Sequence, residues 1–205
     1  MKAILSIFLF FTVIFHSFGQ TEKIEVKVKL HSIEGYGQYE DLANQAIIQL
    51  EKAINSDEFR QGMIYGNFIK TNDLTNKELF YKIILAHEEQ GPGGKDTVID
   101  LRVRTLRINS DESRWKNKCK IGSNSGTIGI DGNGDGVTAI CPQRLKKWKE
   151  ENNVADLAGH YAHEYMHILG FGHYKFLSRD KWRQKTFVYK IGNLVSNLVR
   201  KEMKK

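Results

Sequence analysis

The residues from His163 to His173 read H-E-x-x-H-x-x-G-x-x-H. His163 and His167 lie four positions apart, so on a helix their imidazoles project from one face and can bind one metal ion. Glu164 projects to the side of this pair, where it can accept a proton from a water molecule without binding the metal itself. Gly170 has no Cβ and can adopt a left-handed conformation, which lets the chain turn so that His173 supplies a third nitrogen.

Three protein ligands leave a fourth metal position for water, which is typical of catalytic rather than structural zinc sites. Zinc lowers the pKa of a bound water toward about 7, and the Glu164 carboxylate can accept the proton. The motif therefore predicts one Zn²⁺ per chain, held by His163, His167 and His173. Two alternatives remain open: Asp180 supplies the third ligand, or the motif is a helix with incidental histidines that binds no metal.

On this motif the chain resembles the metzincin metallopeptidases, whose long zinc motif it matches at every fixed position. The resemblance implies that His163, His167 and His173 are zinc ligands, that Glu164 is the general base and that Gly170 is the turn glycine. It also implies a zincin-like fold, in which a mixed β-sheet lies above the active-site helix and a smaller C-terminal part lies below it. The activity that it implies is the hydrolysis of peptide bonds.

The resemblance has one departure. Metzincins carry a methionine turn beneath the zinc site, downstream of the third histidine. Here the only methionine after His173 is Met203, in the charged tail Lys-Glu-Met-Lys-Lys. Two interpretations stay open: another apolar residue forms the turn, or the chain is a divergent relative of the family.

Four further side chains near the motif have a structural and a functional interpretation each. His160 either supports the site or is simply packed or exposed, and the second is favoured. Asp156 either orients a ligand imidazole or is a first-turn carboxylate favoured by the helix dipole. Tyr174 and Tyr189 are candidates for a phenol that stabilises the oxyanion of the reaction, although ordinary packing is favoured for both.

A glycine-rich segment resembles the first half of a calcium loop, with Asp131, Asn133 and Asp135 at the D-x-N-x-D-G spacing. The twelfth position of such a loop needs a bidentate Glu, and this chain has Pro142 there. A hairpin or turn is therefore the favoured interpretation, because Asp-Gly and Asn-Gly pairs are typical of turns. A Ca²⁺ ion bound by these three residues is the alternative.

Residues 1–19 have the layout of a secretory signal peptide. Lys2 is followed by an apolar run from Ala3 to Phe15 and by small residues before a cut that precedes Gln20. The run is shorter than the roughly 20 residues of a membrane-spanning helix, so we expect no stable membrane insertion after cleavage. An uncleaved anchor is the alternative. Residues 20–205 are predicted to form one metallopeptidase domain, secreted or periplasmic.

The sequence contains two cysteines, Cys119 and Cys141. In an oxidising compartment such a pair predicts one disulfide bond. Closing a loop of this size would stabilise the fold by roughly 3 kcal/mol in the chain-entropy account. The alternative is two free, buried thiols.

Alternating and helical patterns of apolar residues predict the elements that position the motif. Strands are predicted at 24–30, 61–69, 97–108, 127–130 and 137–140. Helices are predicted at 39–54, 76–87, 142–151, 154–169 and 188–200, with Asn76 and Asn153 as caps and a frayed tail at 201–205. Strands and helices mix without strict alternation, which predicts an α+β fold: a mixed sheet packed on helices, with an active-site helix and a short C-terminal helical part.

The composition is that of a globular chain, with 40% hydrophobic and 27% charged residues and a net charge of +7. It excludes collagen-like, wholly disordered and multi-span membrane proteins. Basic clusters at 102–107 and 146–149 would attract acidic partners. The chain has no zinc-finger or RNA-binding aromatic motif, so no nucleic acid is expected as a partner.

Together these features predict a secreted zinc-dependent endopeptidase that acts on protein or peptide substrates. The predicted strand at 127–130 would by resemblance be an edge that pairs with an extended substrate. Two alternatives from other classes remain. One is a secreted binding protein that keeps the zinc shell without turnover, and the other is a zinc hydrolase of non-peptide amides.

Overall fold

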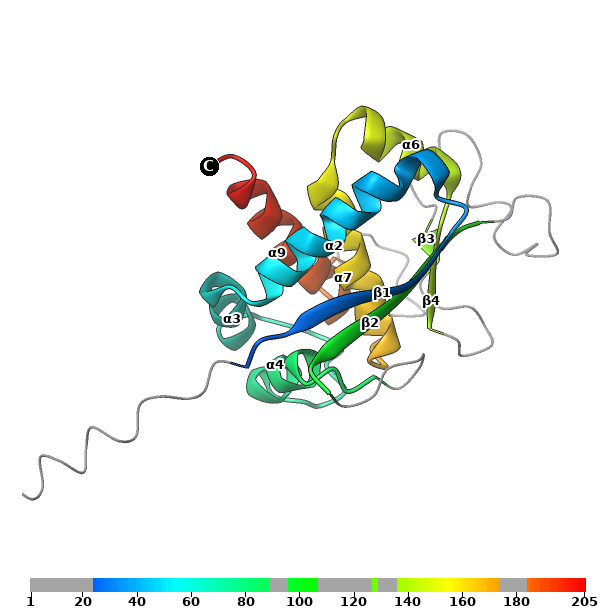
Figure 1. Ribbon diagram of the computed structural model, residues 1–205. Coiled ribbons are helices and arrows are strands. Elements are labelled where there is room, and N and C mark those ends of the chain that lie inside the picture. The colour runs from blue at the N-terminus through cyan, green and yellow to red at the C-terminus, as the bar shows by residue number, and fades with distance from the viewer. Residues whose placement is uncertain (1–23, 89–95, 107–126, 129–135, 174–183) are drawn as a thin grey trace, which may run out of the picture.

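The computed structural model describes residues 24–88, 96–106, 127–128, 136–173 and 184–205 (Figure 1). The strands are β1 (Lys27–Glu34), β2 (Val98–Thr105), β3 (Thr127–Ile128) and β4 (Val137–Ile140). The helices are the 3-10 helix η1 (Gly37–Tyr39), α2 (Glu40–Ile54), α3 (Asp57–Ile64), α4 (Asn76–Ile84), α6 (Pro142–Glu150), α7 (Val154–Ile168) and α9 (Phe187–Glu202). This combination confirms the predicted α+β class, with a mixed sheet packed on helices.

The sheet has the order β1-β2-β4-β3. β1, β2 and β4 are parallel, and β3 runs antiparallel to β4. Alternate residues of β2 point to one face and are fully or almost fully buried there, namely Ile99, Leu101 and Val103. The end of α2 covers the start of the outer edge of β1, because Asn55 exchanges hydrogen bonds with Val26, just before the strand, and Glu51 accepts one from the Val28 amide. The start of this edge is therefore closed to a further strand.

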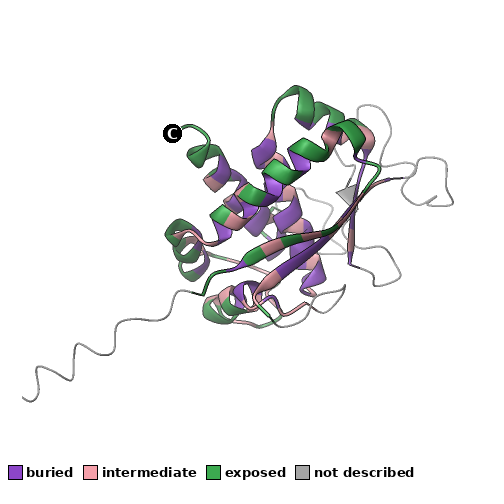
Figure 2. Cartoon of the chain, viewed as in Figure 1, coloured by how far each residue is buried: buried purple, intermediate pink, exposed green. Residues whose placement is uncertain are grey.

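Helices α2, α7 and α9 form the packed layer that carries the motif (Figure 1). Their buried sides face one another and their exposed sides face outward (Figure 2). Leu157, Tyr161 and Tyr165 of α7 belong to the same core cluster as Ile99 and Leu101 of the sheet. Burial of each such side chain contributes about 1.5–3 kcal/mol, so α7 is held rigidly at the centre of the fold.

Two glycines let α7 and α9 approach each other closely. A Cβ atom on Gly159 would lie 2.5 Å from the carbonyl oxygen of Gly192. A Cβ atom on Gly192 would lie 2.8 Å from the carbonyl oxygen of Gly159 and 3.0 Å from the Cβ of His163. The backbones of the two helices therefore touch, and the start of α9 lies directly against a residue of the motif.

Some local predictions were wrong. The segment predicted as a strand at 61–69 contains the end of α3 instead, because the Ser56 hydroxyl accepts a hydrogen bond from the Phe59 amide and starts a helix. Phe59 and Met63, four residues apart, then share its buried face. The cap of α4 is Thr75, not Asn76, because Thr75 and Glu78 form a reciprocal capping box.

Several predictions fall outside the described residues: the signal peptide at 1–19, Cys119, the calcium loop at Asp131, Asn133 and Asp135, and Tyr174 and Asp180. The disulfide and the calcium site therefore stay predictions. Cys141 is buried at the end of β4. No helix in the described part of the chain combines the length and hydrophobicity of a membrane span.

Candidate functional site

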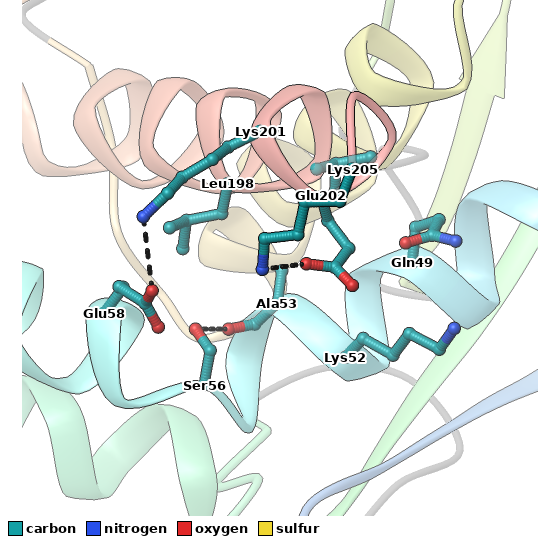
Figure 3. Close-up of a pocket in the computed structure, with 10 residues that line it drawn as sticks. Gln49, Lys52, Ala53, Ser56, Glu58, Leu198, Lys201, Glu202 and Lys205 are labelled. Carbon is teal, nitrogen blue, oxygen red and sulfur yellow. Dashed lines mark hydrogen bonds and ion pairs between the residues drawn. The ribbon is translucent and has the colours of Figure 1, made fainter.

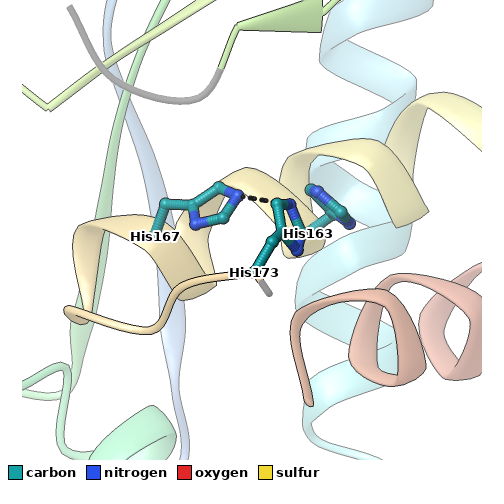
Figure 4. A group of neighbouring side chains, drawn as sticks. All are labelled: His163, His167 and His173. Atoms are coloured by element: carbon teal, nitrogen blue, oxygen red, sulfur yellow. Dashed lines mark hydrogen bonds between the residues drawn. The ribbon is translucent and has the colours of Figure 1, made fainter. Parts of the chain in front are cut away.

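The structure brings the three predicted ligands together at the C-terminal end of α7 (Figure 4). His163, His167 and His173 each offer one ring nitrogen, and these nitrogens lie within 4.8 Å of one another. The Nε2 atoms of His167 and His173 are 3.1 Å apart. Within the described ranges, no other three His, Cys, Asp or Glu side chains converge in this way.

The turn after α7 is what returns His173 to the helix. Gly170 has a φ of 87°, a left-handed conformation that favours glycine. The Gly170 amide donates to the carbonyl oxygen of His167 at 2.9 Å, and the Phe171 amide donates to that of Met166 at 3.0 Å. These two bonds form a Schellman motif, which ends the helix and reverses the chain as the sequence predicts.

His167 is oriented by the same turn. Its Nδ1 lies 2.7 Å from the carbonyl oxygen of Phe171. Because a carbonyl oxygen only accepts, Nδ1 carries the hydrogen, and the Nε2 lone pair is left facing His173. Burial lowers the pKa of His167, so its imidazole is neutral at pH 7, which is the form that binds metals. The Phe171 ring packs edge-on against Phe187 of α9, with centroids 4.6 Å apart, and supports the turn.

Glu164 lies beside the three histidines and not among them. Its side chain is 3% exposed, and its Oε1 is 4.0 Å from His163 Nε2. The same oxygen is 3.5 Å from Nε2 of His160. This is the place that the sequence predicts for a carboxylate that takes protons without binding the metal.

His160 is packed, as favoured from the sequence, but it also faces the site. Its ring lies 5.7 Å from that of Trp148 on α6 and is stacked on that of His163 at 6.1 Å. Burial, with smaller contributions from the charges of Arg144 and His167, lowers the pKa of His160 to about 3. The imidazole is therefore neutral at physiological pH, with one N–H to donate.

Tyr189, which the sequence offers as a candidate phenol of the site, lies in the first turn of α9 and packs against the histidines. Its ring centroid lies 4.5 Å from that of His163, edge-on, and 4.9 Å from that of His173. Met203, the only methionine after the motif, lies at the far end of the same helix and is 47% exposed. A tyrosine thus packs against two of the three histidines, and no local sequence pattern marks it because the contact depends on how α9 crosses α7.

Replacing Tyr189 by Ala should weaken zinc binding about tenfold, because two imidazoles lose the ring that fixes their orientation. Tyr189→Phe should keep the wild-type zinc affinity within about twofold, since the ring remains. Competition with a chromophoric chelator measures both affinities. Tyr65→Ala, which removes a ring that is 83% exposed, is the control. An equal loss in the Phe and Ala variants would show that the hydroxyl, not the packing, is responsible.

Asp156 does not take the orienting role considered for it. It lies in the first turn of α7, where its carboxylate accepts from the Ser196 hydroxyl at 3.0 Å and pairs with Arg200. Asn153 caps the helix by accepting from the Asp156 amide, as predicted. Asp156 therefore ties the start of α7 to α9 and serves the fold.

A second, half-buried carboxylate lies against another side of α7. Glu88 Oε1 accepts from the Tyr165 hydroxyl at 2.9 Å and from the Asp100 amide at 3.2 Å. Burial raises the pKa of Glu88 to about 7. Asp100 in turn bonds the His31 ring of β1 at 2.5 Å. This network joins α7 to two strands of the sheet, and its members are too far apart in the sequence for a local pattern to reveal it.

A cavity of about 250 Å³ lies away from the histidines, between α2, α3 and the end of α9 (Figure 3). Lys201 bonds Glu58 at 3.3 Å, and Lys205 bonds Glu202 at 2.7 Å. Most of the charged side chains that line the cavity are thus paired with one another. The cavity shares no lining residue with the histidine cluster.

The three histidines fit a zinc ion. Three imidazole nitrogens are a donor set typical of catalytic zinc, and the separation of 3.1 Å between two of them is close to the roughly 3.3 Å of two nitrogens on one zinc ion. Comparison of the chain with protein-family models, with curated proteins and with solved structures finds no match.

Proposed function

We propose that this protein is a secreted zinc-dependent endopeptidase of metzincin-like type. The observation that carries the proposal is the convergence of His163, His167 and His173 with the Glu164 carboxylate beside them. A structural zinc site needs four protein ligands and no neighbouring base, whereas this arrangement has three ligands and one base.

The residues have separate roles in this mechanism. The three histidines hold the ion, which when bound acidifies a water molecule and polarises a carbonyl group. Glu164 takes the proton from the attacking water and later delivers it to the departing amine. Its position next to His163, at 3% exposure, keeps bulk water from competing for that proton. Tyr189 packs against His163 and His173 and supports two of the three ligands.

The sheet offers a place for an extended substrate. β3 ends the strand order and pairs only with β4 among the described residues. An extended peptide can add to such an edge through backbone hydrogen bonds, which do not depend on side chains. The opposite edge is covered at the start of β1 by Asn55 and Glu51. This difference supports β3 as the substrate edge.

The test is to measure zinc content and cleavage of a peptide library on the exported protein. We expect one zinc ion per chain by mass spectrometry of the metal, and cleavage that a chelator abolishes and added zinc restores. Cleavage that is equally fast in the zinc-free protein would overturn the proposal. Bound zinc without cleavage of peptides would favour the binding protein, and cleavage only of small amides would favour the non-peptide hydrolase.

A further inference from the structure

His160 and Glu164 face each other inside the protein. They lie four positions apart on α7, so both side chains project toward the same side of the helix. His160 Nε2 and Glu164 Oε1 are 3.5 Å apart, and the two side chains are 10% and 3% exposed. His160 Nε2 is buried and has no hydrogen-bond partner among the described residues, and at this separation a small rotation of either side chain would complete a hydrogen bond with Glu164.

The direction of that bond follows from the chemistry of the two groups. An ionised carboxylate only accepts, so the imidazole nitrogen that faces it must carry the hydrogen. If the imidazole presented an acceptor to the carboxylate, both buried acceptors would lack a hydrogen bond. Unsatisfied buried acceptors destabilise the folded protein. The favoured form of His160 is thus the one protonated at Nε2.

His160 is itself held in place from two sides. The Trp148 ring of α6 lies 5.7 Å away, and the His163 ring is stacked on it with an interplanar angle of 17°. Trp148 is in turn covered by Arg144, whose guanidinium lies 4.7 Å from the centre of the indole ring. A donor fixed in this way can restrict the orientation of a flexible glutamate.

We propose that His160 is a positioning residue for Glu164: its Nε2–H donates to Oε1 and holds the carboxylate beside His163. This inference rests on the proposed function. A general base must be aligned with the proton that it abstracts, and a glutamate that rotates freely would be aligned only part of the time.

Two substitutions separate the hydrogen-bond donor of the His160 side chain from the space that the side chain fills. His160→Leu removes the N–H, and His160→Gln keeps an amide donor at a similar reach. We expect both zinc-loaded variants to keep one zinc ion per chain and to melt within a few degrees of the wild type. The Leu variant should lose about 10- to 100-fold in kcat with KM nearly unchanged, and the Gln variant should recover kcat to within about threefold. A folded, zinc-loaded Leu variant with wild-type kcat overturns the proposal, and so does a Gln variant as slow as the Leu variant.

A spectroscopic measurement, which needs no catalysis, tests the hydrogen bond between His160 and Glu164. In the zinc-loaded protein, long-range ¹H–¹⁵N spectra should show His160 protonated at Nε2, and Glu164→Gln should shift that nitrogen. Protonation at Nδ1, or no response to Glu164→Gln, overturns the proposal. If the wild type hydrolyses nothing, the proposed function fails while these spectra still decide on the hydrogen bond.

Discussion

Replacing Glu164 by Gln should leave one zinc ion per chain and reduce peptide hydrolysis at least about 1,000-fold. Gln has nearly the same size and keeps the buried packing, but its amide cannot accept the proton of the attacking water. General base catalysis contributes about 10²- to 10⁴-fold, so its loss is large. Zinc stays because Glu164 lies beside the three histidines and is not one of the ligands. The measurement is kcat/KM on a cleaved library peptide, with metal content determined on the same sample.

Glu88→Gln is the matched control for this experiment. Glu88 is a half-buried carboxylate that is also bound to α7, through Tyr165, but it lies apart from the histidines. Its variant should keep kcat/KM within about threefold, because it touches none of the reacting groups. A Glu164→Gln enzyme as fast as the wild type would contradict the assignment of Glu164 as the base.

Replacing His167 by Ala should abolish both zinc binding and hydrolysis. This imidazole presents its Nε2 to His173, and its Nδ1–H bonds the turn that carries His173, so the substitution removes one ligand and loosens another. We expect zinc affinity to fall at least about 100-fold, by comparison with losses of 10- to 100-fold for groups that only support a ligand. Equilibrium competition with a chelator measures the zinc affinity of the variant and of the wild type.

The same variant has a signature in thermal unfolding. Zinc at 100 times its Kd should stabilise the wild type by about 2.7 kcal/mol, which raises Tm, while the His167→Ala protein should show no rise. His31→Ala, at a histidine bonded to Asp100 and outside the cluster, should respond to zinc as the wild type does. A zinc-dependent rise in Tm that survives in His167→Ala would show that the metal binds elsewhere.

The helix and turn that carry the site could be predicted because their signals are local. Asn153 marks the start of α7 and Gly170 its end, and the structure has both where the spacing puts them. The strand predicted at 61–69 was wrong because the residue that starts a helix there, the Ser56 cap, lies before the segment. The segment itself has a strand-like apolar pattern. Local periodicity alone does not resolve such short elements.

The support around the site could not be predicted in the same way. Tyr189 reaches His163 only because α9 crosses α7 at two glycines, and a single sequence does not reveal which helices cross. The bonds of Glu88 with Tyr165 and Asp100 likewise join distant segments. His160 is the intermediate case, since its spacing to Glu164 is visible in the sequence but its burial is not.

The contact between Gly159 and Gly192 has a consequence for the C-terminal end of the chain. It seats the last helix against His163, so an ion bound at the proposed site would be thermodynamically linked to that helix. Under the proposed function, detachment of α9, for example by proteolytic trimming of the terminus, would lower the affinity of the histidines for zinc. Conversely, loss of zinc would leave this end of the chain more open to proteolysis.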